Sequence, residues 1–193
     1  MTLPAIIEPE DPRYPIGQLA LPKTLTPQAR QAAIDELAAF PQQLSAAIAD
    51  LTEAQLDTPY RQPINGDEVW TLRQLVHHLA DSHATAYCWM RLALTNPPLP
   101  ESWPTVYAYD PAAIAKLEDS HLPAQISLQL LEALHQRWTS TLQSVPGEDW
   151  QTRGYLHPET GPCSLEQTLA MYAWHSRHHL AQILKCRQRH GWI

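Results

Sequence analysis

The chain has 193 residues, a formal net charge of −7, 44% apolar residues and 17% charged residues, a composition typical of one soluble globular domain over residues 1–193. Its six glycines form neither a dinucleotide-binding motif nor a P-loop, and an acidic balance without a Lys/Arg cluster argues against nucleic acid as a partner. The absence of a long apolar run, of a signal peptide and of paired cysteines predicts a cytoplasmic protein with free thiols and no membrane partner.

Proline marks where helices can form, because it breaks helix interiors and the chain has 18 of them. Residues 1–23 contain five prolines and are expected to form an extended arm on the body of the protein. The first helix is predicted over about residues 27–51, with Thr26 as its N-cap and Pro27 at the first helical position. Pro41 is a place where this helix could bend.

Three further helices follow in the chain. The second, over about 72–95, and the fourth, over about 165–189, each begin with a capping box, in which Ser or Thr is followed three residues later by Gln. The third spans about 125–143 and has apolar residues three and four apart. No stretch alternates with period two for long, so no sheet is predicted.

The predicted fold class is all-α, because four amphipathic helices of this length bury their apolar stripes most simply in a four-helix bundle. The segments between the helices, 52–70, 96–124 and 144–163, are longer than the usual connections in a bundle. The middle one is expected to hold a short helix near 111–118. Long loops of this kind could wall a functional site at one end of the bundle.

Six of the ten histidines lie in two short windows of the second and fourth helices. At 100° per residue, His175 and His179 are about 40° apart at the edge of the apolar face, and His78 has the same placement on its own helix. Two imidazoles four residues apart can share one metal ion. We therefore expect His78, His175 and His179 to bind a metal if their helices are neighbours. Three imidazoles leave a coordination position open, which is typical of a catalytic site.

The other histidines of these windows have different expectations. His83 falls within the apolar stripe and is predicted to be a hydrogen-bonded core residue. His77 and His178 are expected to face solvent or to support a ligand. Residue 176 is Ser, so the segment is not the H-E-x-x-H motif of zincin proteases.

The run WTLRQLVHHLADSH at residues 70–83 and the run WHSRHH at 174–179 resemble the DinB-like superfamily, and most closely its YfiT group of metal-dependent hydrolases. Further matching stretches are residues 14–17, 56–61, 134–138 and 153–158. The resemblance implies a four-helix bundle, a homodimer, and one divalent metal ion per chain held by His78, His175 and His179. Zinc is the first candidate, and nickel or iron are alternatives.

Three functions are compatible with such a site. In a hydrolase, the metal lowers the pKa of bound water to about 7. In an S-transferase, the metal holds a low-molecular-weight thiol such as bacillithiol as the thiolate that attacks an electrophile. In a non-catalytic stress-response module, the metal site is closed, for instance by Cys186 as a fourth ligand. The expected partner of either enzyme is a small-molecule substrate.

The catalytic residues are less well indicated than the metal ligands. A hydrolase needs a general base near the metal, and the candidates are Asp81 and His157. Asp81 and Gln182 could instead orient a ligand imidazole. If the protein is a transferase, three arginines could bind carboxylates of an anionic thiol, and Trp89 could line the pocket. These arginines are Arg73, Arg137 and Arg177.

Overall fold

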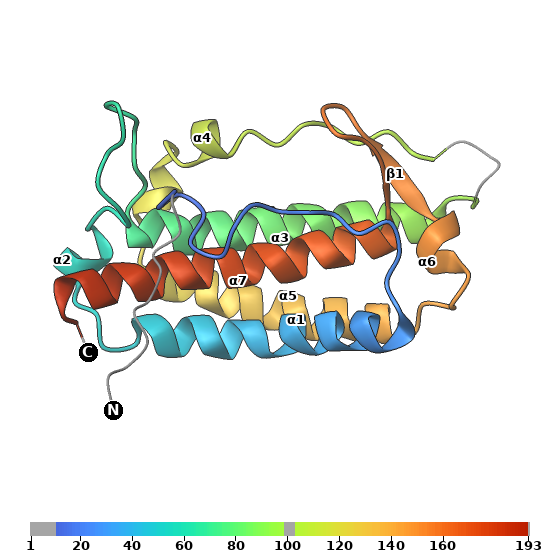
Figure 1. The fold of residues 1–193 in the computed structure, drawn as a ribbon, viewed down its shortest axis with the longest axis horizontal. Helices are drawn as coiled ribbons and strands as arrows, with labels where there is room; N and C mark the ends of the chain where they lie inside the picture. The colour runs from blue at the N-terminus through green and yellow to red at the C-terminus, as the bar shows by residue number, and fades with distance from the viewer. Residues whose placement is uncertain (1–10, 99–102, 193) are drawn as a thin grey trace.

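The computed structural model describes residues 11–98 and 103–192. Four long helices lie side by side in these residues and form the predicted bundle (Figure 1). They are α1 (Pro27–Ile48), α3 (Leu72–Thr95), α5 (Ala124–Gln143) and α7 (Leu165–His190). The first helix ends three residues earlier than the sequence predicts, and it continues without a break through Pro41.

The order of the helices around the bundle places the two histidine-bearing helices next to each other. Helix α3 packs against α5 and α7, and α1 packs against the same two helices. Figure 1 shows that residues 103–123 run back along the bundle before α5 begins, so α3 and α5 run parallel. Helices α3 and α7 are therefore antiparallel neighbours, which is the arrangement that a shared site on their facing edges requires.

Both predicted capping boxes are formed. The Thr71 hydroxyl accepts from the backbone N–H of Gln74 at 3.1 Å, and the Gln74 side chain accepts from the backbone N–H of Thr71 at 3.0 Å. Ser164 and Gln167 make the same pair of bonds at the start of α7. These bonds satisfy N–H groups that have no partner inside the helix, and they fix where each histidine-bearing helix begins.

A two-stranded antiparallel hairpin, β1 (Gly154–His157) and β2 (Gly161–Ser164), precedes α7. The expectation that the chain has no sheet is thus wrong for this segment, because strands of four residues are too short to show a period of two. Gly154 is required by space, since a Cβ there would lie 2.3 Å from the carbonyl oxygen of Cys163 and 2.8 Å from the Trp103 ring.

The long connections carry short helical turns. These are α2 (Glu53–Leu56), α4 (Pro111–Ile114), the 3₁₀ turn η1 (Glu118–His121) and α6 (Asp149–Thr152). The helix predicted near 111–118 corresponds to α4 and the start of η1. None of the helices in the described parts of the chain is long and apolar enough to cross a membrane.

Residues 11–23 of the predicted arm run along α7 (Figure 1), and residues 1–10 lie outside the described part of the chain. The carbonyl of Arg13 accepts a hydrogen bond from the Gln182 side chain of α7 at 2.9 Å. Leu19 and Pro22 line a shallow cleft together with Ala173 and Trp174, farther along the same helix. The arm therefore covers α7 beside the predicted metal ligands.

Candidate metal centre

His78 of α3 and His175 and His179 of α7 bring one nitrogen each to a common point. The Nε2 atom of His175 lies 3.2 Å from Nε2 of His78 and 3.1 Å from Nε2 of His179. One nitrogen from each of the three rings lies within 4.8 Å of the others. His78 and His179 are buried, whereas His175 is partly exposed. The three candidate ligands thus converge on one point.

The side-chain amide of Gln182 fixes the tautomer of His179. Its NH₂ group donates to the Arg13 carbonyl at 2.9 Å, and a carbonyl can only accept. The amide oxygen of Gln182 therefore faces His179 Nδ1, 2.8 Å away, and Nδ1 must carry the proton. In a neutral imidazole, this leaves Nε2 of His179 as an unprotonated acceptor at the common point.

His175 and His78 also have a partner on the ring nitrogen that faces away from the common point. His175 Nδ1 lies 3.2 Å from Nε2 of His83. His78 Nδ1 lies 3.3 Å from the hydroxyl of Tyr109, which can donate or accept. The Trp70 ring packs against His78 with 4.8 Å between ring centroids. Each candidate ligand is thus held in orientation by a different neighbour, as is usual for metal-binding histidines.

Burial keeps these imidazoles neutral. Desolvation lowers the pKa of His78 to about 4. It lowers the pKa of His175 and His179 well below the ordinary value, and the neighbouring histidines lower it further. A metal ion competes with protons for these nitrogens, so neutral imidazoles at pH 7 favour metal binding.

The residues present fit a divalent metal ion. Metal–nitrogen bonds of about 2.0–2.1 Å in a tetrahedral site place two ligand nitrogens about 3.3 Å apart. The spacings of 3.1 and 3.2 Å around His175 Nε2 are close to that value. Neutral imidazole nitrogens suit zinc, copper, iron and nickel, so the donor set by itself selects no single metal.

A cleft with a volume of about 280 Å³ opens beside the cluster. His179, Gln182 and Trp70 line it, together with Arg13 and Tyr14 of the arm. The cleft can therefore bring a small molecule to the side of the cluster.

The two candidate bases differ in where they lie. Asp81 is one turn beyond His78 on α3, and burial and Asp119 raise the pKa of its carboxyl. Nδ1 of His78 nevertheless bonds Tyr109 rather than Asp81. Among the described residues, no hydrogen bond joins Asp81 to a candidate ligand.

His157 is not brought to the cluster. Its Nδ1 accepts from the backbone N–H groups of Glu159 and Thr160 in the hairpin turn. Its ring packs against Trp89, 5.3 Å between centroids. Trp89 is eleven residues beyond His78, about 16 Å along the helix axis. Trp89 itself is buried under the hairpin and does not wall the cleft.

Cys186 and the arginines have other partners. The Cys186 thiol faces the carbonyl of Pro59, which leaves the proposed fourth ligand pointing elsewhere. Arg73 is buried in ion pairs with Glu53 and Asp57 of the connection around α2. Arg177 pairs with Glu36, and Arg137 lies over the ring of Tyr87. None of the three arginines lines the cleft beside the cluster.

Of the two histidines expected to face solvent or to support a ligand, neither faces solvent, and among the described residues only His178 bonds a residue that supports a ligand. His77 is buried and bonds Ser127 and the carbonyl of Leu122, so it does not face solvent. His178 is also buried; it stacks on Trp174 and accepts from Gln182, the residue that holds His179. The prediction that His83 is a hydrogen-bonded core histidine is confirmed.

Tyr109 and His135 both contribute to the arrangement around the cluster, and the sequence predicts a role there for neither of them. Tyr109 reaches His78 from the long connection after α3. His135, which belongs to α5, forms a hydrogen bond with His83; the two ring nitrogens are 2.8 Å apart. The position of a loop residue has no periodic signal, and the polar role of His135 depends on helix packing.

A model of the DinB superfamily matches residues 37–183. A protein of Bacillus cereus named "Putative metal-dependent hydrolase" is 43% identical over 182 residues, which cover 94% of this chain and 99% of that protein. A Bacillus thuringiensis protein with a similar name matches equally well. The solved structure of YfiT from Bacillus subtilis, described as a probable metal-dependent hydrolase with an unusual four-helix bundle topology, has a TM-score of 0.85 and 38% identity. The match covers 94% of this chain and 99% of the YfiT chain.

Proposed function

Because the chain belongs to the DinB superfamily, we propose that it is a metal-dependent hydrolase that acts on a small molecule in the cleft beside His179. His78, His175 and His179 would hold one divalent metal ion, with zinc as the first candidate and nickel or iron as alternatives. The names of the Bacillus relatives support the hydrolase class at a coarse level.

The observation that carries the metal site is the close approach of two acceptors. The hydrogen bonds of Gln182 leave Nε2 of His179 unprotonated. Hydrogen bonds that start at the Leu37 carbonyl and pass through His135 and His83 require His175 Nδ1 to donate, which leaves Nε2 of His175 unprotonated as well. These two atoms are 3.1 Å apart. Two lone pairs facing each other repel, and a bound cation turns the same geometry into an attraction.

A divalent ion held by three imidazoles supplies Lewis acidity, which activates water and polarises a carbonyl oxygen. The chain's own residues hold the imidazoles in place: Gln182 orients His179, Tyr109 contacts His78 and His83 orients His175. Arg13 and Tyr14 of the arm line the cleft together with His179. Asp81, one turn from His78, is the proposed base, although it does not line the cleft.

The metal site is tested by replacing one ligand. We expect wild-type protein dialysed against zinc to retain about one ion per chain, and His175→Ala to lose most of it, because two imidazoles bind far more weakly than three. Mass spectrometry of the metal content makes the measurement. His190→Ala, an exposed histidine at the end of the same helix, is the matched control and should keep its metal. Equal metal content in His175→Ala would show that the triad is wrong.

Thiol S-transfer is the second candidate function, since neither Asp81 nor His157 contacts a ligand histidine. A transferase needs less from the protein because the metal itself activates the sulfur. An activity screen separates the two. Metal-loaded protein is offered a panel of esters and amides, and a model electrophile with each of several small thiols. Turnover of esters or amides that a chelator abolishes supports the hydrolase; turnover only with a thiol overturns it.

The assembly and location of the protein belong to the same proposal. We propose a homodimer, which light scattering after gel filtration would test.

A cytoplasmic location is supported by the three free cysteines, Cys88, Cys163 and Cys186, because free thiols are typical of reducing compartments.

A further inference from the structure

A chain of hydrogen bonds leads from the candidate ligand His175 through the core to the opposite side of the bundle. His175 Nδ1 lies 3.2 Å from His83 Nε2, and His83 Nδ1 lies 2.8 Å from His135 Nε2. His135 Nδ1 lies 2.6 Å from the carbonyl oxygen of Leu37. The four residues come from α7, α3, α5 and α1, so the chain connects all four helices of the bundle.

The carbonyl at the end fixes the direction of every bond in the chain. Leu37 can only accept, so His135 Nδ1 carries a proton and His135 Nε2 is an acceptor. His83 Nδ1 must then donate to His135, which leaves His83 Nε2 as an acceptor. His175 Nδ1 in turn must donate to His83. The result is that Nε2 of His175, the atom at the common point, is unprotonated.

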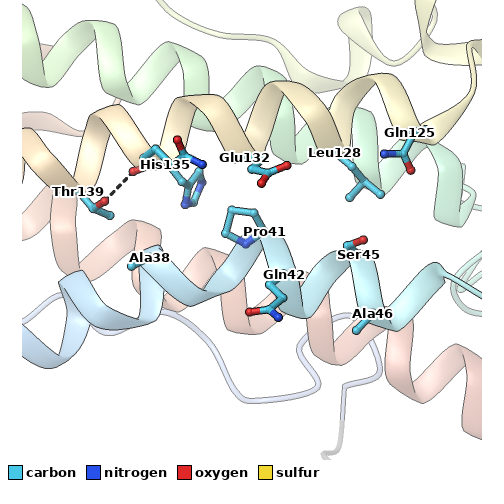
Figure 2. Close-up of a pocket in the computed structure, with 11 residues that line it drawn as sticks. Ala38, Pro41, Gln42, Ser45, Ala46, Gln125, Leu128, Glu132, His135 and Thr139 are labelled. Atoms are coloured by element: carbon cyan, nitrogen blue, oxygen red, sulfur yellow. Dashed lines mark hydrogen bonds between the residues drawn. The ribbon is translucent and has the colours of Figure 1, made fainter.

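Pro41 explains why the Leu37 carbonyl is available. In a regular helix the N–H of residue 41 would donate to the carbonyl of residue 37, but proline has no N–H. Figure 2 shows Pro41 of α1 facing His135 of α5 across the space between the two helices. The proline inside α1 thus frees an acceptor where His135 needs one.

Aromatic packing holds the rings of the chain in this orientation. Phe40 lies against His83 and His135, with ring centroids 5.5 and 5.7 Å away. The Trp138 ring meets His83 edge-on at 5.9 Å. His83 and His135 are 0% and 1% exposed, so their hydrogen bonds are shielded from bulk water. A ring flip would break two buried hydrogen bonds, which the surrounding packing disfavours.

We propose that His83 and His135 are positioning residues that fix the tautomer and orientation of the metal ligand His175, with the proline-freed carbonyl of Leu37 as the anchor. This inference rests on the proposed metal site, because it assigns these histidines their role through a metal ligand. Loss of such outer partners typically weakens metal binding by about 10–100-fold.

Three variants test the role. His83→Phe keeps a ring but removes both hydrogen bonds, so we expect the zinc dissociation constant, measured by competition with a chelating dye, to rise by about 10–100-fold. His83→Gln keeps an acceptor for His175 and should recover most of the affinity. His77→Phe removes a buried histidine of the same helix whose hydrogen bonds, among the residues that the structure describes, go to Ser127 and the Leu122 carbonyl. This variant should bind zinc as the wild type does. An equal loss of zinc affinity in all three variants would show that His83 has only a structural role, and it would overturn the inference.

Nuclear magnetic resonance of the metal-free wild-type protein tests the hydrogen bonds from His175 to Leu37 without any variant. We expect ¹⁵N–¹⁵N couplings across the hydrogen bonds from His175 to His83 and from His83 to His135, and an unprotonated Nε2 on His175. A protonated Nε2 on His175 or missing couplings would overturn the inference even if zinc binds normally. Observed couplings in a protein that binds no divalent metal would instead refute the proposed metal centre, and with it the positioning role.

Discussion

Gln182 joins three parts of the molecule through one side chain. Its oxygen accepts from the candidate ligand His179, and its NH₂ group donates to the Arg13 carbonyl of the arm and to His178. The side chain is 4% exposed, so these partners are largely shielded from bulk water. The sequence places Gln182 beside the ligand face by its helical angle, but its bond to the arm depends on where residues 11–23 lie.

Two replacements of Gln182 separate its support of the ligand His179 from its hydrogen bond to the arm. Gln182→Leu removes every bond, so we expect zinc affinity to fall by about 10–100-fold and the arm to become more sensitive to protease. Gln182→Glu keeps an acceptor for His179 but loses the donor to Arg13, so the arm should loosen while most zinc affinity remains. Chelator competition and limited proteolysis make the two measurements. A leucine variant with wild-type zinc affinity would show that Gln182 does not support the ligand.

At the scale of elements, α3 begins at Leu72, six residues before the candidate ligand His78, and its start is fixed by a local signal. The capping box of Thr71 and Gln74 is visible in the sequence and formed in the structure. Helix starts are predictable in this way because the bonds that cap them join residues only three apart. The hairpin was not predicted, because its register depends on pairing between strands too short to show alternation.

The cap of α3 gives a stability prediction. Thr71→Ala removes the acceptor for the Gln74 N–H, so we expect the free energy of unfolding to fall by about 1 kcal/mol. Urea denaturation followed by circular dichroism makes the measurement. Thr71→Ser keeps the hydroxyl and should lose much less. Equal stability of the alanine variant and the wild type would mean that the cap contributes nothing to α3.

On the scale of the whole molecule, buried neutral histidines link folding to pH. Burial lowers the pKa of His135 to about 4, whereas the unfolded value is about 6.5. Below pH 6.5 the unfolded chain binds a proton that the folded chain does not, so stability is lost as the pH falls. His78 and His178 act in the same direction, with their pKa values also lowered to about 4.

We therefore expect the free energy of unfolding of the metal-free protein to decrease as the pH falls from about 6.5 to about 4, by up to about 1.4 kcal/mol per pH unit for each such histidine. Chemical denaturation at a series of pH values measures this slope, and His135→Phe should make it shallower. Asp67, whose pKa Arg61 lowers to about 2, acts only at lower pH. A stability that stays constant over this window would contradict the prediction.

The sequence by itself determined the features that depend on neighbours along the chain. Helical periodicity and capping residues predicted four helices, and the angle of each histidine on its helix placed His78, His175 and His179 at the edge of the apolar face. Whether those edges face each other depends on topology, which periodicity does not encode. The tertiary structure decided it by running α3 and α7 antiparallel as neighbours.

Only the tertiary structure decided which partners support the three histidines. His175, His83, His135 and Leu37 are linked across 92, 52 and 98 residues of sequence, and a hydrogen bond depends on distances of about 3 Å that only helix packing sets. A core histidine and a proline inside a helix are unremarkable when read along the chain. Packed together, they leave one nitrogen of His175 unprotonated at the point where three imidazoles meet.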